Sequence, residues 1–114
     1  MLTVEALRQF GANTNEGLSR CLNNEAFYLR LVNLALNDAN FEKLTAAFSA
    51  GDRDAAFQAA HALKGSLSNL ALTPLLRPVS ALTDLLRGGQ VEGCAAYLEE
   101  ITKVRSQLLA LREG

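Results

Sequence analysis

The sequence has few of the residues that several classes of site require. It contains one histidine, two cysteines and no tryptophan among 114 residues. A single histidine cannot supply the paired Glu-x-x-His ligands of a carboxylate-bridged di-iron bundle. The cysteines, Cys21 and Cys94, lack the spacing of a zinc site or of a redox CxxC motif. We therefore expect two reduced thiols in a cytoplasmic protein, and no metal or other cofactor bound by this chain.

The sequence also has no excess of positively or negatively charged residues. The chain has 11 Lys and Arg against 12 Asp and Glu, a formal net charge of −1, and its basic residues are scattered. A nucleic-acid-binding protein would show a basic stripe, so we expect no nucleic-acid partner. No apolar run approaches the ~18 residues that cross a bilayer, and no targeting peptide is recognisable, so we expect no membrane association. The sequence also lacks a Gly-rich phosphate loop, a Ser-His-Asp set and a nucleotide fingerprint, which leaves it without machinery to bind ATP.

Leucine and alanine dominate the sequence, whereas β-branched alternation is absent and prolines are few. Hydrophobic residues make up 49% of the chain, which is enough for a core, and the length of 114 residues fits one domain over 1–114. The pattern predicts an all-α fold. The expected architecture is an antiparallel four-helix bundle preceded by one or two short N-terminal helices.

Two short helices are predicted first, followed by a longer one. The first spans 3–10 and the second runs from Thr14 or Asn15 to Leu22. The longer helix begins at Glu25. Four of its apolar positions follow helical spacing and suggest its inner face: Phe27, Leu31, Leu34 and Ala35.

The polar segment 37–40 leaves two alternatives open. It either bends the helix that begins at Glu25, or divides it from a second helix whose apolar face resumes at Phe41. Gly51 ends this part of the chain, and Asp52 is the expected cap of the next helix.

Two further helices complete the expected bundle. Thr73 is the predicted cap of the first, with Pro74 at its first position, where a missing N–H has no consequence. Pro78, one turn later, would remove a backbone hydrogen bond, so this helix either starts irregularly or becomes regular only after Pro78. It closes at 87–89, and the last helix spans about 91–111.

The helix that begins after Asp52 and ends near residue 70 carries the single histidine. Its apolar stripe is Ala56, Ala60, Leu63, Leu67 and Leu70. At ~100° per residue, His61 lies about 140° from the middle of this stripe, so the imidazole should face outward. Lys64 and Gly65 are its i+3 and i+4 neighbours, and Ser68 falls under the same patch.

Gly65 occupies a position that disfavours glycine. A glycine inside a helix costs about 1 kcal/mol relative to alanine, and Gly65 points outward with His61. We therefore favour access for a bulky group over a packing role. Neutral imidazole is a nucleophile at physiological pH, and Lys64 suits a phosphoryl group of charge about −2. An exposed lone histidine often has no function, and spacing alone does not decide between these interpretations.

The run His61-Ala62-Leu63-Lys64-Gly65-Ser66 resembles the H-x-L-K-G-S signature of histidine-containing phosphotransfer (HPt) domains of two-component relays. The resemblance covers nearly the whole chain, including Ala50-Gly51-Asp52, Asn69-Leu70 and the stretch 20–28. The family often has a second glycine where this sequence has Ala71. We expect that position to affect packing or the helix end, and to leave the phosphoryl acceptor intact.

The resemblance implies a phosphocarrier. His61 would accept and donate the phosphoryl group, and Lys64 would be its charge partner. Gly65 would give clearance, and Ser68 would donate a hydrogen bond to the ring or to phosphoryl oxygens. The implied partners are a response-regulator receiver domain, which would supply an aspartate and Mg²⁺, and a hybrid sensor histidine kinase. Catalysis would reside mainly in the partner, so the chain itself is not expected to be an enzyme.

Two other interpretations remain. The chain would act as a non-catalytic helical adaptor if it bound a receiver or kinase domain without phosphotransfer. An intact His61-Lys64-Gly65 set favours transfer over this alternative. A fragment of a larger kinase is a third and less favoured possibility. We expect a monomer, because no heptad seam is sustained.

Overall fold

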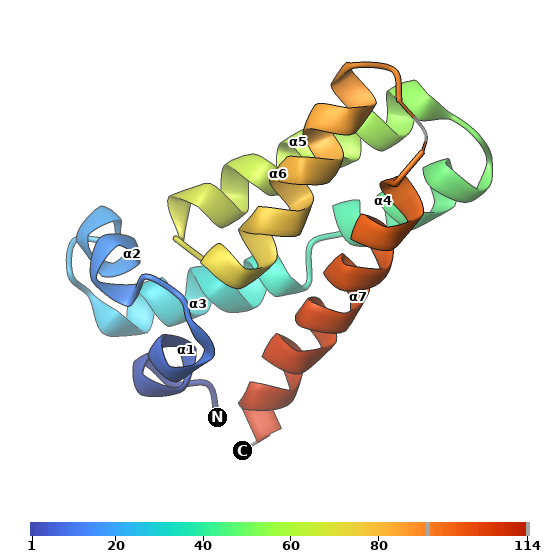
Figure 1. Cartoon of the computed structure of the whole chain (residues 1–114). Coiled ribbons are helices and arrows are strands. Elements are labelled where there is room, and N and C mark those ends of the chain that lie inside the picture. Colours follow the sequence, from blue (N-terminus) through green and yellow to red (C-terminus); the bar gives the residue numbers. More distant parts are fainter. Residues whose placement is uncertain (91, 114) are drawn as a thin grey trace.

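The computed structural model describes residues 1–90 and 92–113, and over these it is helical throughout, with no strand (Figure 1). This confirms the predicted all-α class. The helices are α1 (Val4–Phe10), α2 (Thr14–Arg20), α3 (Glu25–Leu36), α4 (Asn40–Ser49), α5 (Arg53–Asn69), α6 (Thr73–Arg87) and α7 (Cys94–Ala110), followed by a 3₁₀ turn, Leu111–Glu113. None of these helices combines the length and hydropathy of a membrane span.

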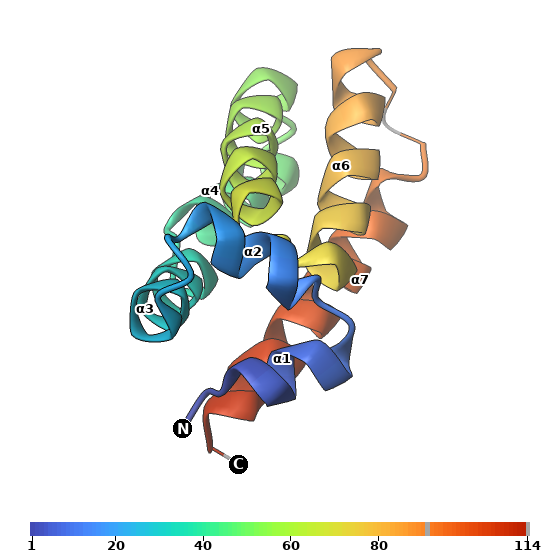
Figure 2. The ribbon, with the colours of Figure 1, turned by 90° about the vertical axis from the view of Figure 1, so that its left-hand side faces the viewer.

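α3 and α4 follow one another in the same general direction, and α5, α6 and α7 then alternate in direction (Figure 1). α5 packs against both α4 and α6, and α6 packs against α7 (Figure 1). Figure 2 shows α5 and α6 side by side, with α2 lying across the end at which α5 finishes and α6 begins. The predicted antiparallel bundle with two short N-terminal helices is thus confirmed, and α5 lies at its centre, between α4 and α6.

The core follows the leucine pattern. Every residue of the predicted α5 stripe is less than 9% exposed: Ala56, Ala60, Leu63, Leu67 and Leu70. These side chains meet leucines of α6 and apolar residues of α3, α4 and α7 in one hydrophobic cluster. Because the stripe is fully used in packing, the opposite face of α5 is left for solvent.

The predicted inner face of α3 is only partly right: Ala35 is buried as predicted and Leu31 is half-buried, but the other two positions face outward. The helix buries Tyr28, Val32, Ala35 and Leu36. Phe27 and Leu34, predicted as core, are 41% and 59% exposed. The sequence of α3 carries two adjacent apolar stripes, and only one can face the bundle. Tyr28 favours the observed choice, because its buried hydroxyl donates a hydrogen bond to the Leu70 carbonyl over 3.0 Å.

Residues 37–39 divide α3 from α4, which settles the open alternative in favour of two helices. The Asp38 carboxylate accepts a hydrogen bond from the Asn40 amide at 2.8 Å, where α4 begins. Arg105 of α7 spans the break: its Nε donates to the Leu36 carbonyl at 2.8 Å. Its guanidinium carbon lies 4.3 Å from the centroid of the Phe41 ring. Arg105 thereby supplies a donor for a carbonyl that the end of α3 leaves without a helical partner.

Two predicted boundaries around α6 and α7 are wrong. Thr73 is the first residue of α6 and not its cap, since its hydroxyl donates to the Ala71 carbonyl at 3.4 Å. α7 begins at Cys94 rather than near 91, after Gly93 in a left-handed conformation with φ 89°. Residue 91 lies outside the described residues. The predicted irregular start is wrong as well, since α6 is continuous from Thr73 and Pro78 lies buried inside it.

The turn between α2 and α3 also departs from prediction. α2 ends at Arg20, so Leu22 lies beyond the helix and is 87% exposed. Leu22 and Asn23 both adopt left-handed conformations, with φ of 59° and 55°. The amide of Asn23 donates to the Leu18 carbonyl at 2.8 Å, which closes the end of α2.

Candidate functional site

The N-terminal end of α5 is fixed by two charged side chains. The Asp52 carboxylate caps the helix by accepting from the Ala55 amide at 3.1 Å, as predicted. The next residue, Arg53, donates to the Gly89 carbonyl at 3.0 Å and so ties the start of α5 to the turn after α6. Both contacts lie at one end of the helix and leave its middle free.

The other end of α5 is held by the N-terminal part of the chain. The Ser68 carbonyl accepts from Arg20 of α2 at 2.5 Å, and the Leu70 carbonyl accepts from Tyr28 of α3. The Ala71 carbonyl accepts from the backbone amide that precedes α2. Burial, and secondarily the neighbouring Cys21, raise the pKa of Tyr28 to about 12. α5 is therefore anchored by three separate donors where its own hydrogen-bond ladder ends.

Ala71 occupies the left-handed position of a Schellman motif, with φ 55°. Its amide donates to the Ser68 carbonyl and the Leu72 amide donates to the Leu67 carbonyl, both at 3.1 Å. Glycine adopts this conformation without a Cβ penalty, whereas another residue pays about 1 kcal/mol or more. The position at which the family often has a second glycine therefore acts at the end of α5, away from the imidazole.

His61 stands in the middle of α5 with its side chain exposed. Its ring centroid lies 5.7 Å from that of Phe57, one turn earlier, with an interplanar angle of 35°. Within residues 1–90 and 92–113 the imidazole has no hydrogen-bond or ion-pair partner. Both ring nitrogens are therefore free to meet an incoming group.

Sequence reasoning missed two residues at this site. Phe57 is in ring contact with the imidazole, and Arg87 of α6 lies over the Phe57 ring at 5.7 Å from its centroid. Arg87 also pairs with Asp84 at 2.9 Å, with both side chains largely exposed. The i−4 spacing of Phe57 was a signal available in the sequence. The approach of Arg87 depends on how α6 packs against α5, which the sequence alone does not specify.

Lys64 and Gly65 occupy the predicted positions next to His61. Lys64 is half-buried, and the described part of the chain offers its ammonium group no carboxylate partner. A Cβ added to Gly65 would meet nothing within 4 Å. The backbone of Gly65 is not left-handed either. Neither packing nor backbone conformation therefore requires glycine at this position.

Ser68 is exposed, as predicted, but lies two turns beyond His61. A helical rise of ~1.5 Å per residue places it about 10 Å along the axis, beyond hydrogen-bond reach of the imidazole. Its role as a donor to the ring is thus not supported by the geometry. Ser68 lies near the C-terminal end of the exposed face of α5, where its backbone carbonyl accepts a hydrogen bond from Arg20.

No metal centre is evident over residues 1–90 and 92–113: no three His, Cys, Asp or Glu side chains are placed to share an ion. Cys21 and Cys94 are free and buried. Burial raises the pKa of the Cys94 thiol, which donates to the Gln90 carbonyl at 3.3 Å. Cys94 therefore has a structural contact and lies outside the His61 site.

Comparison with protein families gives one finding that bears on this site. The model of the Hpt domain matches residues 32–114, which include α4 to α7 and leave α1 and α2 outside. No curated protein and no solved structure matches the chain. The family match covers well over half of the sequence and includes the whole helix that carries His61. The chain therefore belongs to the histidine-containing phosphotransfer (Hpt) domain family.

Proposed function

We propose that the chain is a phosphorelay phosphocarrier of two-component signal transduction, and that His61 accepts and donates the phosphoryl group. The observation that carries this proposal is an exposed imidazole without a protein partner, next to a lysine without a carboxylate and to open space over Gly65. Membership of the Hpt family supports the same role.

The transfer step uses the imidazole of this chain, and the partner supplies the other groups that it requires. The unprotonated nitrogen of the neutral imidazole attacks the phosphorus of an aspartyl phosphate on the donor. A P–N bond forms, the P–O bond to the aspartate breaks, and the carboxylate leaves with the electron pair. The second ring nitrogen keeps its proton, and the reverse sequence returns the phosphoryl group to an aspartate.

Two cationic side chains would stabilise the negative charge of the incoming phosphoryl group. Lys64 is one turn from His61 and its flexible stem can bring the ammonium to a phosphoryl oxygen. At ~4 Å and an effective dielectric near 20, each unit of charge gains about 4 kcal/mol, and less at an exposed site. Arg87 lies over the Phe57 ring and is paired with Asp84, so we assign it the weaker effect.

The proposed partners are a response-regulator receiver domain and a hybrid sensor histidine kinase. The receiver would supply the aspartate and Mg²⁺, so the chain itself would not be the catalyst. We further propose that the chain works as a monomer in the cytoplasm. The near-neutral net charge of −1 gives little long-range steering, so docking should depend on apolar contact around α5.

The test is transfer from receivers that carry radiolabelled phosphate. The native chain should acquire an acid-labile, alkali-stable label from at least one receiver, and His61→Gln should acquire none. No label from any receiver of the source cell, or equal labelling of His61→Gln, contradicts the proposal.

A binding measurement separates the carrier from an adaptor. A carrier loses signalling in cells when His61 is replaced by Gln, even if affinity for the receiver is unchanged. If the variant binds and signals like the native chain, binding alone is the function and the adaptor interpretation holds.

A further inference from the structure

We infer that Phe57 positions the imidazole of His61 for transfer, by holding the ring in one orientation that leaves the side toward Lys64 and Gly65 open. This inference rests on the proposed function, because it names a residue that governs the same reaction. The reacting group is the imidazole itself, so Phe57 acts through His61 and is a positioning residue.

The imidazole has no polar group to fix its orientation. In the part of the chain that the structure describes, it has no hydrogen bond or ion pair, and its ring contact is with Phe57. The two ring centroids are 5.7 Å apart and the rings are tilted by 35°. This separation lies within the range of roughly 4.5–7 Å at which aromatic pairs attract each other. The orientation of the imidazole therefore depends on an aromatic contact.

The direction of helical side chains agrees with this contact. Long side chains of an α-helix lean toward its N-terminus, over the preceding turn. Phe57 is the i−4 neighbour of His61 and Gly65 the i+4 neighbour, so the imidazole leans toward Phe57 and away from Gly65. A Cβ added to Gly65 would accordingly meet no atom within 4 Å, the imidazole included. The turn before His61 is thus occupied by an aromatic ring, whereas the turn after it is open to a phosphoryl donor.

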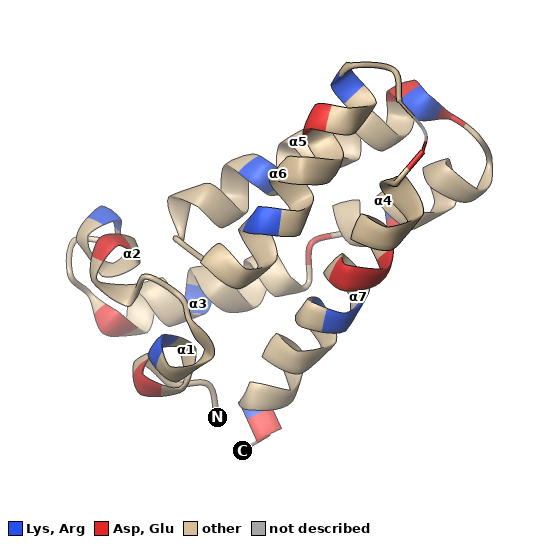
Figure 3. Cartoon of the chain, viewed as in Figure 1, with Lys and Arg blue, Asp and Glu red and all other residues tan. Residues whose placement is uncertain are grey.

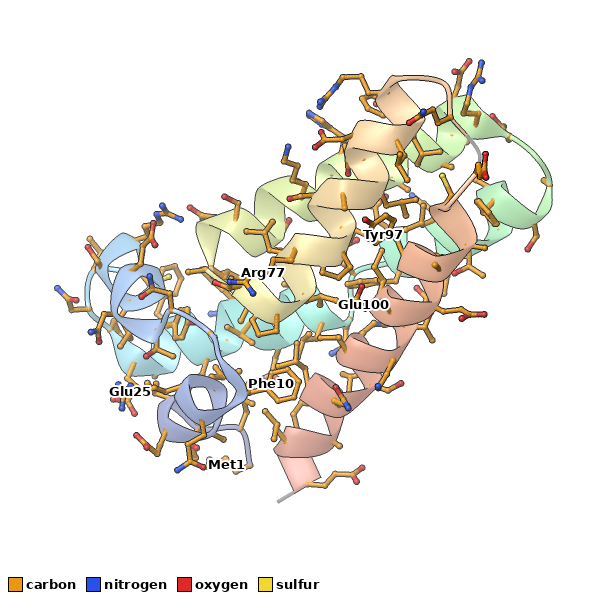
Figure 4. All side chains as sticks on the ribbon, in the orientation of Figure 1. Met1, Phe10, Glu25, Arg77, Tyr97 and Glu100 are labelled. Atoms are coloured by element: carbon orange, nitrogen blue, oxygen red, sulfur yellow. The ribbon has the colours of Figure 1, made fainter. Side chains whose placement is uncertain are left out.

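Phe57 is itself held between the core and α6. Its half-buried side chain packs against the hydrophobic cluster, and the guanidinium of Arg87 lies over its ring, 5.7 Å from the centroid. Arg87 pairs in turn with Asp84 at 2.9 Å, and these two are the charged residues of the C-terminal half of α6 (Figure 3). Arg77 lies toward the start of α6 (Figure 4), about 15 Å from Arg87 along the helix axis. A path of contacts therefore runs from the end of α6 through Phe57 to the imidazole.

The number of orientations that Phe57 restrains sets the size of its effect. In an α-helix χ1 near +60° is rare, which leaves two χ1 wells, and χ2 of histidine is about twofold, so a free imidazole has roughly four orientations. If one of them is productive, equal occupation of all lowers its population about fourfold. A fourfold change corresponds to about 0.8 kcal/mol, within the range of one aromatic pair. The contact with Phe57 is therefore strong enough to select one orientation.

The test measures single-turnover transfer from a phosphorylated receiver to Phe57→Leu, which keeps an apolar side chain and removes the ring. The rate constant at saturating receiver should fall about fourfold, whereas the half-saturating receiver concentration should stay within about twofold. Labelling by phosphoramidate, a small donor that can approach the imidazole in any orientation, should also change less than about twofold. Phe57→Tyr keeps the ring and should retain the native rate.

NMR supplies a readout that a loss of stability alone does not move. His61 is the single histidine, so the two carbon-bound protons of its imidazole are assigned without ambiguity. The native chain should show a nuclear Overhauser effect between these protons and the Phe57 ring, whose ring current should displace their chemical shifts. Phe57→Leu should move the shifts toward those of a free histidine.

Phe48→Leu is the matched control. Phe48 is a second half-buried phenylalanine packed on the same core, and it lies on α4. The variant should lose stability to a similar extent and leave the transfer rate and the His61 shifts unchanged.

Four results would overturn the inference: a native rate in Phe57→Leu, a loss expressed only in the half-saturating concentration, an equal loss in Phe48→Leu, or no Overhauser effect in the native chain. A native chain that neither a receiver nor phosphoramidate labels would instead contradict the proposed function itself.

Discussion

Gly65 is a residue at which stability and function oppose each other. Its α-helical backbone would accept alanine, and no neighbouring atom lies where a Cβ would stand. The remaining reason for glycine is the space it leaves beside His61 for a partner. A substitution can therefore improve the fold and impair the activity at once.

Gly65→Ala is expected to raise the free energy of unfolding by about 1 kcal/mol, the difference in helix propensity. Urea unfolding measures this gain. Transfer from a receiver should slow in the same variant, because the added methyl group narrows access to the imidazole. Gly17→Ala is the control for a packed glycine: its Cβ would lie 2.5 Å from the Tyr28 ring, so it should destabilise the chain. A Gly65→Ala variant that transfers at the native rate would remove the access argument.

Arg87 is the residue at the site that only the structure reveals. Arg87→Gln is expected to lower the phosphorylated fraction of His61 at equilibrium about two- to fivefold, the range of an exposed ion pair. Lys64→Gln should have the larger effect, since Lys64 is a direct helical neighbour of His61. Equilibrium labelling at several salt concentrations measures both. An Arg87→Gln effect that exceeds that of Lys64→Gln would reverse the roles assigned to the two cations.

Among the elements, α5 could be predicted best and α3 least well. The leucine stripe, the Asp52 cap and the outward direction of His61 follow from spacing alone, because one apolar stripe leaves one possible phase. α3 has two adjacent stripes, and its phase is decided by Tyr28, whose partner Leu70 is 42 residues away. The break before α4 was ambiguous for the same reason: Arg105, which spans it, comes from the far end of the chain.

The end of α5 gives a prediction about helix termination. Ala71→Gly should stabilise the chain by about 0.5–1 kcal/mol, because glycine accepts the left-handed φ of 55° without strain. Transfer should be unchanged, since Ala71 lies two turns or more from His61. Gly51→Ala is the opposite control: its φ is +71° and its side chain would meet nothing within 4 Å, so the backbone effect is isolated. Denaturant unfolding of both variants should give changes of opposite sign.

At the scale of the whole molecule, the N-terminal part of the chain fastens the helix that carries the site. α1 and α2 lie outside the Hpt family match, yet side chains of α2 and α3 hold the carbonyls at the end of α5. No local sequence signal predicts these contacts, because each joins residues more than 40 positions apart.

Tyr28 makes this connection sensitive to alkaline pH. The pKa of Tyr28 rises from 10 in a model peptide to about 12 in the folded chain. Between pH 10 and 12 the folded state keeps the Tyr28 proton, whereas the unfolded chain loses it. The contribution of Tyr28 to the free energy of unfolding is therefore complete below pH 10 and is lost as the pH rises from 10 to 12. The loss amounts to roughly 2–3 kcal/mol. Unfolding free energies across this range should fall for the native chain and fall less for Tyr28→Phe; parallel curves would contradict the assignment.

The central claim is that His61 carries the phosphoryl group, and ³¹P NMR of the chain treated with phosphoramidate tests it most directly. His61 is the single histidine of the sequence, so any phosphohistidine signal belongs to it. The native chain should show a phosphohistidine resonance that disappears on acidification, and His61→Gln should show none. A native chain without that resonance, or a resonance that persists in His61→Gln, would contradict it.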